Sequence, residues 1–257
     1  LSEIKDIVEE PAKKACLKWE IDDKANVLHK LVVKEAMAIR ELPLIEFALS
    51  ELYNMRDEND CLTFEAYNKI GGMKGAIVSY ANSFYASLSQ EEKEALSIVL
   101  SFVIASSEKN DTCVRKTSLM KDVCSTKVQK QLVKKLIDAH LLVAGKDSGG
   151  QSTVTIVHET LIKHWSVVQE WIEQQKDFLK TSAYYEQRAK HWVNNARSAY
   201  NLISEKTALL EGEYFLYKYS KQVSKEVKDF LLASMKKERR KGIVWQTMLG
   251  SFLLLGI

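Results

Sequence analysis

One histidine in the second half of the chain has a setting that suits a binding role. His158 follows the strand-like run STVTIV and precedes Glu159, at the start of the helical pattern HETLIKHW. An imidazole can donate a hydrogen bond to a phosphate oxygen, and its pKa near neutrality lets it gain charge beside that oxygen. A capping or core histidine at a strand-to-helix junction is the alternative that the sequence leaves open.

The same segment does not have the spacing of a zinc site. His164 follows His158 by six residues, which is about 240° further round a helix of 3.6 residues per turn, so the two imidazoles point away from each other. The cysteines are far apart and form no CxxC pair; they are Cys16, Cys61, Cys113 and Cys124. The sequence therefore predicts no metal site, and it nominates no catalytic residue.

Nucleotide hydrolysis is also outside the reach of this chain alone. The chain contains no GxxxxGK[ST] run, so it cannot cradle a triphosphate in the P-loop manner. By itself the chain is not expected to be an enzyme.

A lysine-rich helical segment raises the question of DNA binding. The pattern TKVQKQLVKKLIDAH places Lys127, Lys130, Lys134 and Lys135 on its outward side, where a recognition helix would face a major groove. Few other positive residues flank the segment, and the whole chain has a net charge of only +3. A solvated helix face is the favoured interpretation, and a DNA-binding transcriptional regulator remains an alternative.

Composition predicts a mainly α fold. Apolar residues make up 46% and charged residues 28% of the 257 residues, as in ordinary globular proteins. Only two prolines and ten glycines occur, so long helices rich in Lys, Glu, Leu and Ala are favoured over sheet.

The first part of the chain predicts a helical bundle over residues 1–72. Asp22 and Asp23 can cap its second helix, and Pro43 can occupy the first turn of a third, LPLIEFALSELYNMR. A short helix capped by the Thr of LTFEAYNKIGG then ends at Gly71 and Gly72, which suit a left-handed turn.

Residues 73–165 predict a winged-helix domain. Two amphipathic helices, joined by a capping box at Ser89, precede the extended piece CVRKT and the helices SLMKDVC and TKVQKQLVKKLIDAH. The strands LLVAGK and STVTIVH then flank the loop DSGGQ, which has the composition of a β-hairpin tip.

The remainder predicts a helical stalk over residues 166–241 and a membrane entry over residues 243–257. The final segment, IVWQTMLGSFLLLGI, has no charge over 15 residues, which is short of the ~20 needed to span a bilayer unless the chain continues. The preceding KKERRKG would keep the other domains on the cytoplasmic side. A buried C-terminal helix is the alternative.

Three stretches resemble the STAND class of signal-transduction NTPases, in particular bacterial members that join a nucleotide-binding core to a winged helix. SEIKDIVEEPAKKACLKWE resembles the opening of the family's lid, related to that of AAA+ and NB-ARC proteins. ELPLIEFALSELYNMR with LTFEAYNKIGGMKGAI resembles its lid helix and exit, and LIDAHLLVAGK with VTIVHETLIKHWSVVQEWI resembles the end of its winged helix. Together they cover about residues 1–180.

The resemblance implies a nucleotide site with ATP or ADP as cofactor. Pro43 would take the place of the family's proline that lies against the nucleotide base, although Glu41 replaces the glycine of the family pattern. His158, with Glu159 after it, would match the winged-helix histidine that touches the diphosphate in the resting state. Mg is expected in the NTPase core rather than in this chain.

The implied function is that of a regulatory lid and winged-helix module, which couples nucleotide state to activation of an effector. The expected partners are the chain's own N-terminal NTPase domain, which would make the parent protein an ATP-hydrolysing NTPase, and C-terminal sensor repeats. A homo-oligomer on activation and anchoring of cytoplasmic domains to the inner membrane through the C-terminal segment are further expectations. A membrane-tethered scaffold without a nucleotide role is a second alternative.

Overall fold

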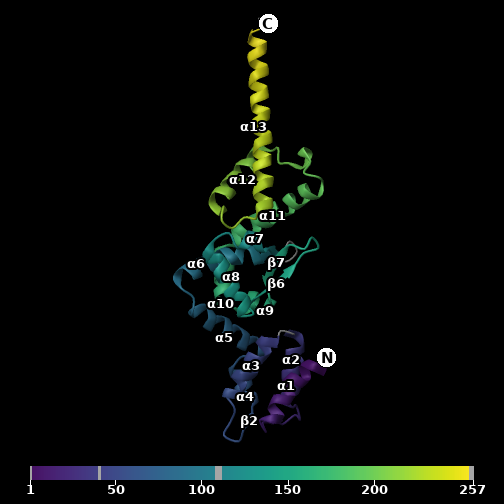
Figure 1. Cartoon of the computed structure of the whole chain (residues 1–257), viewed down its shortest axis with the longest axis vertical. Helices are drawn as coiled ribbons and strands as arrows, with labels where there is room; N and C mark the ends of the chain where they lie inside the picture. The colour runs from purple at the N-terminus through teal and green to yellow at the C-terminus, as the bar shows by residue number, and fades with distance from the viewer. Residues whose placement is uncertain (1, 40–41, 108–111, 255–257) are drawn as a thin grey trace.

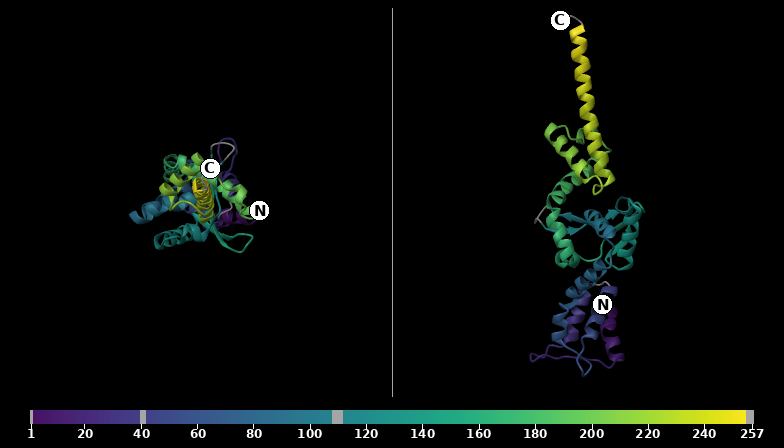
Figure 2. Two further views of the ribbon diagram at one scale, coloured as in Figure 1. Left: turned by 90° about the horizontal axis from the view of Figure 1, so that it is seen from above. Right: turned by 90° about the vertical axis from the view of Figure 1, so that its left-hand side faces the viewer.

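The computed structural model describes the backbone of residues 2–39, 42–107 and 112–254, with all side chains in these ranges except those of Ser2, Pro43 and residues 241–254. The fold is mainly helical with small sheets of two or three strands, as the sequence predicted. Three lobes follow one another along an elongated molecule, and a C-terminal helix projects from its end (Figures 1 and 2).

The N-terminal lobe is a bundle of five helices with a minimal sheet. Its helices are α1 (Ser2–Lys14), α2 (Leu28–Ile39), α3 (Leu42–Asn54), α4 (Phe64–Lys69) and α5 (Gly72–Ala86). The strands β1 (Lys18–Trp19) and β2 (Cys61–Leu62) pair in parallel. α1 packs on α2, and α2 and α3 pack on α5, so the buried apolar face of each helix has a partner.

The segment before α2 differs from the expected helix cap. The Asp22 carboxylate accepts hydrogen bonds from the backbone amides of Lys24 and Asn26, at 2.9 and 2.8 Å. This is a side-chain-stabilised turn, and Ala25 inside it has a positive φ of 59°. Helix α2 begins only at Leu28, because the carboxylate bonds to the turn and not to a helix end.

The turn from α4 into α5 is tightly built. Gly71 and Gly72 have φ values of 75° and 66°, the left-handed conformation that the sequence predicted at these two glycines. The Glu35 carboxylate accepts a hydrogen bond from the Tyr67 hydroxyl at 2.8 Å and a longer one from the Met73 amide at 3.3 Å. Burial and the neighbouring carboxylate raise the pKa of Tyr67, so its hydroxyl keeps the proton that it donates.

The middle lobe combines helices with two small antiparallel sheets. Its elements are α6 (Gln90–Val103), β3 (Ile104–Ser106), β4 (Cys113–Arg115), β5 (Ser118–Leu119), α7 (Met120–Val123), α8 (Lys127–Asp138), β6 (Leu142–Lys146), β7 (Ser152–Ile156), α9 (Glu159–His164) and α10 (Ser166–Gln174). β3 pairs with β4, and the other sheet has the order β5-β7-β6. The β6–β7 hairpin pairs Leu142 with Ile156 and Lys146 with Ser152.

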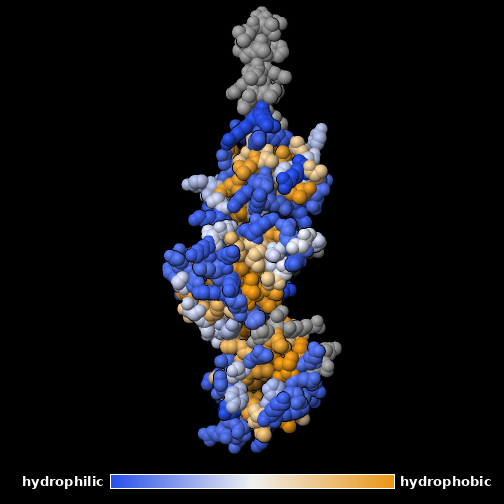
Figure 3. Space-filling view, in the orientation of Figure 1, coloured by the Kyte–Doolittle hydropathy of each residue, from blue (hydrophilic) through white to orange (hydrophobic). Residues whose placement is uncertain are grey.

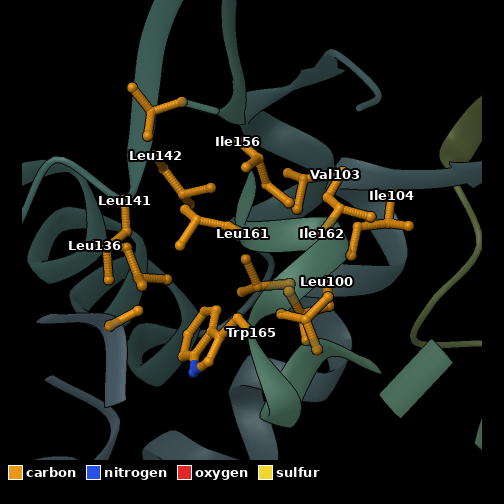
Figure 4. Close-up of a cluster of buried hydrophobic side chains, with 14 of the residues drawn as sticks. Leu100, Val103, Ile104, Leu136, Leu141, Leu142, Ile156, Leu161, Ile162 and Trp165 are labelled. Atoms are coloured by element: carbon orange, nitrogen blue, oxygen red, sulfur yellow. The ribbon is translucent and has the colours of Figure 1, made fainter. Parts of the chain in front are cut away.

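Helix caps and an apolar core fix the middle lobe. Ser89 and Glu92 form a capping box at the start of α6, and Thr126 and Gln129 form one at the start of α8, so each helix has a defined beginning. Apolar side chains from α6, α8, the hairpin and α9 meet beneath the sheet, with Trp165 at the edge of the cluster (Figure 4). This core holds the end of β7 against the rest of the lobe.

The stalk is built on three long helices. They are α11 (Lys176–Asn194), α12 (Lys206–Tyr219) and α13 (Lys225–Leu254), with the short 3-10 helix η1 (Ala199–Asn201) after α11. Phe178 and Phe215 stack with their ring centroids 5.9 Å apart, and the Tyr185 ring lies against the Phe215 ring. Burial raises the pKa of Tyr185 to about 12. α11 and α12 both pack on α13.

The expected membrane anchor is not supported. α13 carries the basic stretch KKERRKG and the apolar residues that follow it as one helix. Within the described ranges, no helix is long and apolar enough to cross a membrane. The prediction of a localisation anchored through residues 243–257, of which 255–257 lie outside the described ranges, is therefore wrong.

Candidate functional site at the junction of the hairpin and α9

His158 lies directly between the hairpin strand β7 and helix α9. It is the N-cap of α9, with extended backbone angles, and its Nδ1 accepts a hydrogen bond from the Thr160 amide at 3.1 Å. A neutral imidazole that accepts at Nδ1 carries its proton on Nε2. The half-buried ring is therefore oriented by the backbone and holds a donor at its far nitrogen.

Arg115 holds the same junction from the neighbouring strand. Its guanidinium Nη1 donates to the Val157 carbonyl at 2.9 Å, and the Ile156 carbonyl lies 3.5 Å away. β4 lies beside α9, so the guanidinium bridges from β4 to the residue before His158. The guanidinium thus binds the backbone directly before His158 and adds a positive charge to this junction.

Glu159 has a different environment from His158. Its carboxylate is 3.3 Å from Lys163 one turn later in α9, and both side chains are largely exposed. An acidic residue in the first turn of a helix is favourable by itself. These contacts give Glu159 a local role in α9.

Pro43 belongs to another lobe than His158. It is the second residue of α3, and its side chain is not among those described; Glu41 lies outside the described residues. The structure brings His158 and Glu159 together as neighbours and describes no contact between either of them and Pro43.

Helix α9 is coupled to the N-terminal lobe through α5. The Trp165 indole Nε1, directly after α9, donates to the Asn82 side chain of α5 at 2.9 Å. The Tyr85 ring meets the Trp165 ring edge-on, with centroids 6.4 Å apart. Since α5 also packs on α2 and α3, one helix contacts both the bundle and the element that carries His158.

The N-terminal end of the lysine-rich helix α8 faces the stalk across a cleft. A cleft of about 590 Å³ joins the first turn of α8, at Thr126 and Gln129, to the turn between α12 and α13, at Ser220 and Lys221. A recognition helix contacts bases chiefly through its N-terminal residues. In this structure the turn between α12 and α13 lines the same cleft as those residues, so a DNA duplex would have to share that space with the stalk.

Comparison with known proteins gives one match. A sequence model of the family described as novel STAND NTPase 1 matches residues 1–200. The match covers well over half of the 257 residues. The chain belongs to the novel STAND NTPase 1 family. No curated protein and no solved structure matches it.

Membership of this STAND family agrees with the resemblance found in the sequence, at the level of the family. Two long-range contacts, one at the site and one in the N-terminal lobe, were not predicted. Arg115 appeared only as part of an extended piece, and nothing in its local pattern shows that β4 lies beside α9. Glu35 is one polar residue in an amphipathic helix, and its contact with Tyr67 bridges 32 positions of the chain.

Proposed function

We propose that this STAND chain is the regulatory lid and winged-helix module of a nucleotide-dependent signalling switch. The N-terminal lobe acts as the lid of an NTPase core, the middle lobe is the winged-helix module, and His158 bonds the diphosphate of ADP. The observation that carries the proposal is the His158 ring, which is fixed by the Thr160 amide with its proton on Nε2. Family membership supports the class of switch.

The residues at the junction suit the chemistry of a phosphate group. Phosphate oxygens accept hydrogen bonds, and the Nε2–H of the neutral His158 ring is a donor that suits them. ADP would supply this anionic acceptor when it is bound. Glu159 is a poor phosphate ligand because its carboxylate would repel phosphate oxygens, so we assign the contact to His158 alone of these two residues.

The lobe contacts support transmission of a change at His158. Loss or gain of the anchor at α9 would alter the packing of Trp165 on α5, and α5 is shared with the N-terminal lobe. Two states of one packed interface are enough for a rigid-body swing of the middle lobe. We propose that such a swing reports nucleotide state to an effector, with the NTPase core and sensor repeats as partners of this chain.

No described contact favours the two alternatives. A DNA-binding regulator needs the N-terminal end of α8, which adjoins the stalk turn. A scaffold without a nucleotide role gives no reason for the paired placement of Arg115 and His158.

The test compares two histidines of one helix in the protein that joins this chain to its NTPase core. His158→Ala should speed release of a fluorescent ADP analogue by about tenfold or more, because a hydrogen bond to a charged group contributes about 1.5–3 kcal/mol. His164→Ala is the matched control, since His164 is exposed at the other end of α9. Equal release rates for wild type and His158→Ala would contradict the proposal.

A further inference from the structure

A cleft at the boundary of the middle lobe and the stalk has walls of opposite charge. One wall is the start of α6, with Glu91 and Glu94. The other is the turn from α12 into α13, with Lys221, and the first turn of α13, with Lys228. The cleft has a volume of about 590 Å³. Hydrophilic side chains gather over α6 and α8 on the face shown in Figure 3.

These charges are not paired across the cleft in the structure. Glu94 accepts a hydrogen bond from Gln90 on its own helix at 3.3 Å. Among the described residues, the ion pairs include none between Glu91 or Glu94 and the two lysines. Nearby, Lys135 of α8 already binds Glu92 at 2.6 Å, so a lysine and a glutamate on this surface do pair when geometry allows.

Glutamines lie in the cleft and beside it. Gln129 lines the cleft, is only 2% exposed, and its Oε1 accepts from the Thr126 amide at 2.8 Å. In the turn between α12 and α13, Gln222 Oε1 is buried without a donor in the described part of the chain. A buried polar group without a partner costs free energy, so the backbone of this turn is not held by a complete set of side-chain hydrogen bonds.

We propose that the turn between α12 and α13 closes onto the start of α6 and the N-terminal end of α8, and pairs Lys221 and Lys228 with Glu91 and Glu94. The closed cleft is an electrostatic latch between the middle lobe and the stalk. Opposite charges attract across the gap, and each exposed pair is weak, so the latch opens and closes readily. The inference is independent of the proposed nucleotide function.

Salt distinguishes this latch from ordinary packing. Exposed charges are screened over about 10 Å at 0.1 M salt and about 3 Å at 1 M. Closure should therefore weaken as salt rises. The pair between Lys116 and Glu186, which joins the β4–β5 segment to α11 at 2.5 Å, is more buried, with side chains 19% and 28% exposed, and should respond less.

Zero-length carbodiimide cross-linking of the whole chain, followed by mass spectrometry, tests the latch directly. The reagent joins a carboxylate to an amine only where the two are in contact. We expect cross-links from Glu91 or Glu94 to Lys221 or Lys228 whose yield falls about threefold or more between 0.05 and 0.5 M NaCl. Cross-links within the pairs Lys135–Glu92 and Lys116–Glu186 serve as internal references for folding.

Charge exchange supplies the matched variants. E91K with E94K, or K221E with K228E, should abolish the cross-cleft products and keep the Lys116–Glu186 reference. The fourfold variant should restore cross-cleft products, now with the lysines on α6 and the glutamates on the stalk. Reference products without cross-cleft products in the wild type would overturn the proposal. Mixing with a ¹⁵N-labelled chain separates pairing within one chain from pairing between two copies. If every cross-cleft product joins a labelled to an unlabelled peptide, the pairing is between copies and the proposal is overturned as well.

Discussion

At the scale of single residues, a backbone amide decides which nitrogen of His158 carries the proton. The Thr160 amide donates to Nδ1 at 3.1 Å, so the neutral ring carries its proton on Nε2. We expect the Nε2–H tautomer in the free chain, seen in long-range ¹H–¹⁵N correlation spectra of the ring. Thr160→Pro removes the amide proton and should give a mixture of tautomers.

Thr160→Ala is the control for that experiment because it removes the same buried side chain and keeps the amide. Proline is tolerated in the first turn of a helix, so both variants should fold. An Nδ1–H tautomer in the wild type would show that the hydrogen bond from the Thr160 amide to the ring is absent.

A second residue-scale prediction concerns acid stability. The pKa of Glu92 is held below its ordinary value of 4.5, first by the hydrogen bond from Lys135 and then by the Ser89 amide. A lowered pKa in the folded state means that the charged carboxylate stabilises the fold above pH 4.5 and that this contribution is lost as pH falls through the lower folded value.

Glu92→Gln should lower the free energy of unfolding by about 0.5 kcal/mol at pH 7, because only the ion pair with Lys135 is lost. The glutamine oxygen can still accept from the Ser89 amide, as that of Gln129 accepts at the start of α8. The difference from wild type should shrink below pH 4.5. Urea unfolding at several pH values measures it, and a double-mutant cycle with Lys135→Gln isolates the pair. A difference that is constant down to pH 3 would show that the charge of Glu92 has no part in it.

At the scale of elements, the turn between α4 and α5 leaves no room for a side chain at Gly75. A Cβ there would lie 2.3 Å from the Ile70 carbonyl oxygen, which is backbone and cannot rotate away. Gly75→Ala should therefore destabilise the N-terminal lobe by about 2 kcal/mol.

Gly149→Ala is the matched control, because a Cβ in the hairpin tip would meet only the Asp147 side chain at 3.4 Å. Its effect should stay within about 0.5 kcal/mol. Denaturant midpoints of the two variants make the comparison. Equal midpoints would show that the α4–α5 turn relaxes freely.

Local signals in the sequence predicted most helices, and long-range contacts account for what it did not predict. The capping residues Ser89 and Thr63 and the glycines Gly71 and Gly72 act within a few positions, so they were identified correctly. The parallel pair of β1 and β2 joins two-residue strands that are 43 positions apart, Lys18 with Cys61, and two residues show no periodicity.

The candidate site also has one residue that local pattern predicted and one that it did not. His158 was placed correctly at the start of a helix, because the change from strand to helix pattern occurs at that residue. Arg115, which binds the Val157 carbonyl just before His158, comes from a strand 43 positions earlier that pairs with β3. Pattern within a segment cannot show which other segment lies beside it.

At the scale of the whole molecule, α5 is the helix through which the N-terminal and middle lobes meet. Its first half buries Met73, Ala76 and Ile77 in the N-terminal lobe. Its second half carries Asn82 and Tyr85, which contact Trp165. A substitution at the junction of α5 and α9 should therefore change the stability of α9, the helix that His158 caps.

Two alanine substitutions, one of an asparagine and one of a serine, test this coupling. Asn82→Ala leaves the buried Trp165 indole without its acceptor, and Ser97→Ala does the same to the Trp171 indole inside the middle lobe. Each loss costs about 1 kcal/mol, which corresponds to about a fivefold rise in local opening. In hydrogen exchange followed by mass spectrometry, Asn82→Ala should speed exchange in α9 and at the second half of α5, whereas Ser97→Ala should speed exchange in α10. Because both variants remove the acceptor of a Trp indole, a difference between them comes from the position of the lost hydrogen bond alone. If Asn82→Ala leaves exchange in α9 unchanged, other contacts hold the two lobes together and α5 does not transmit a change from one lobe to the other.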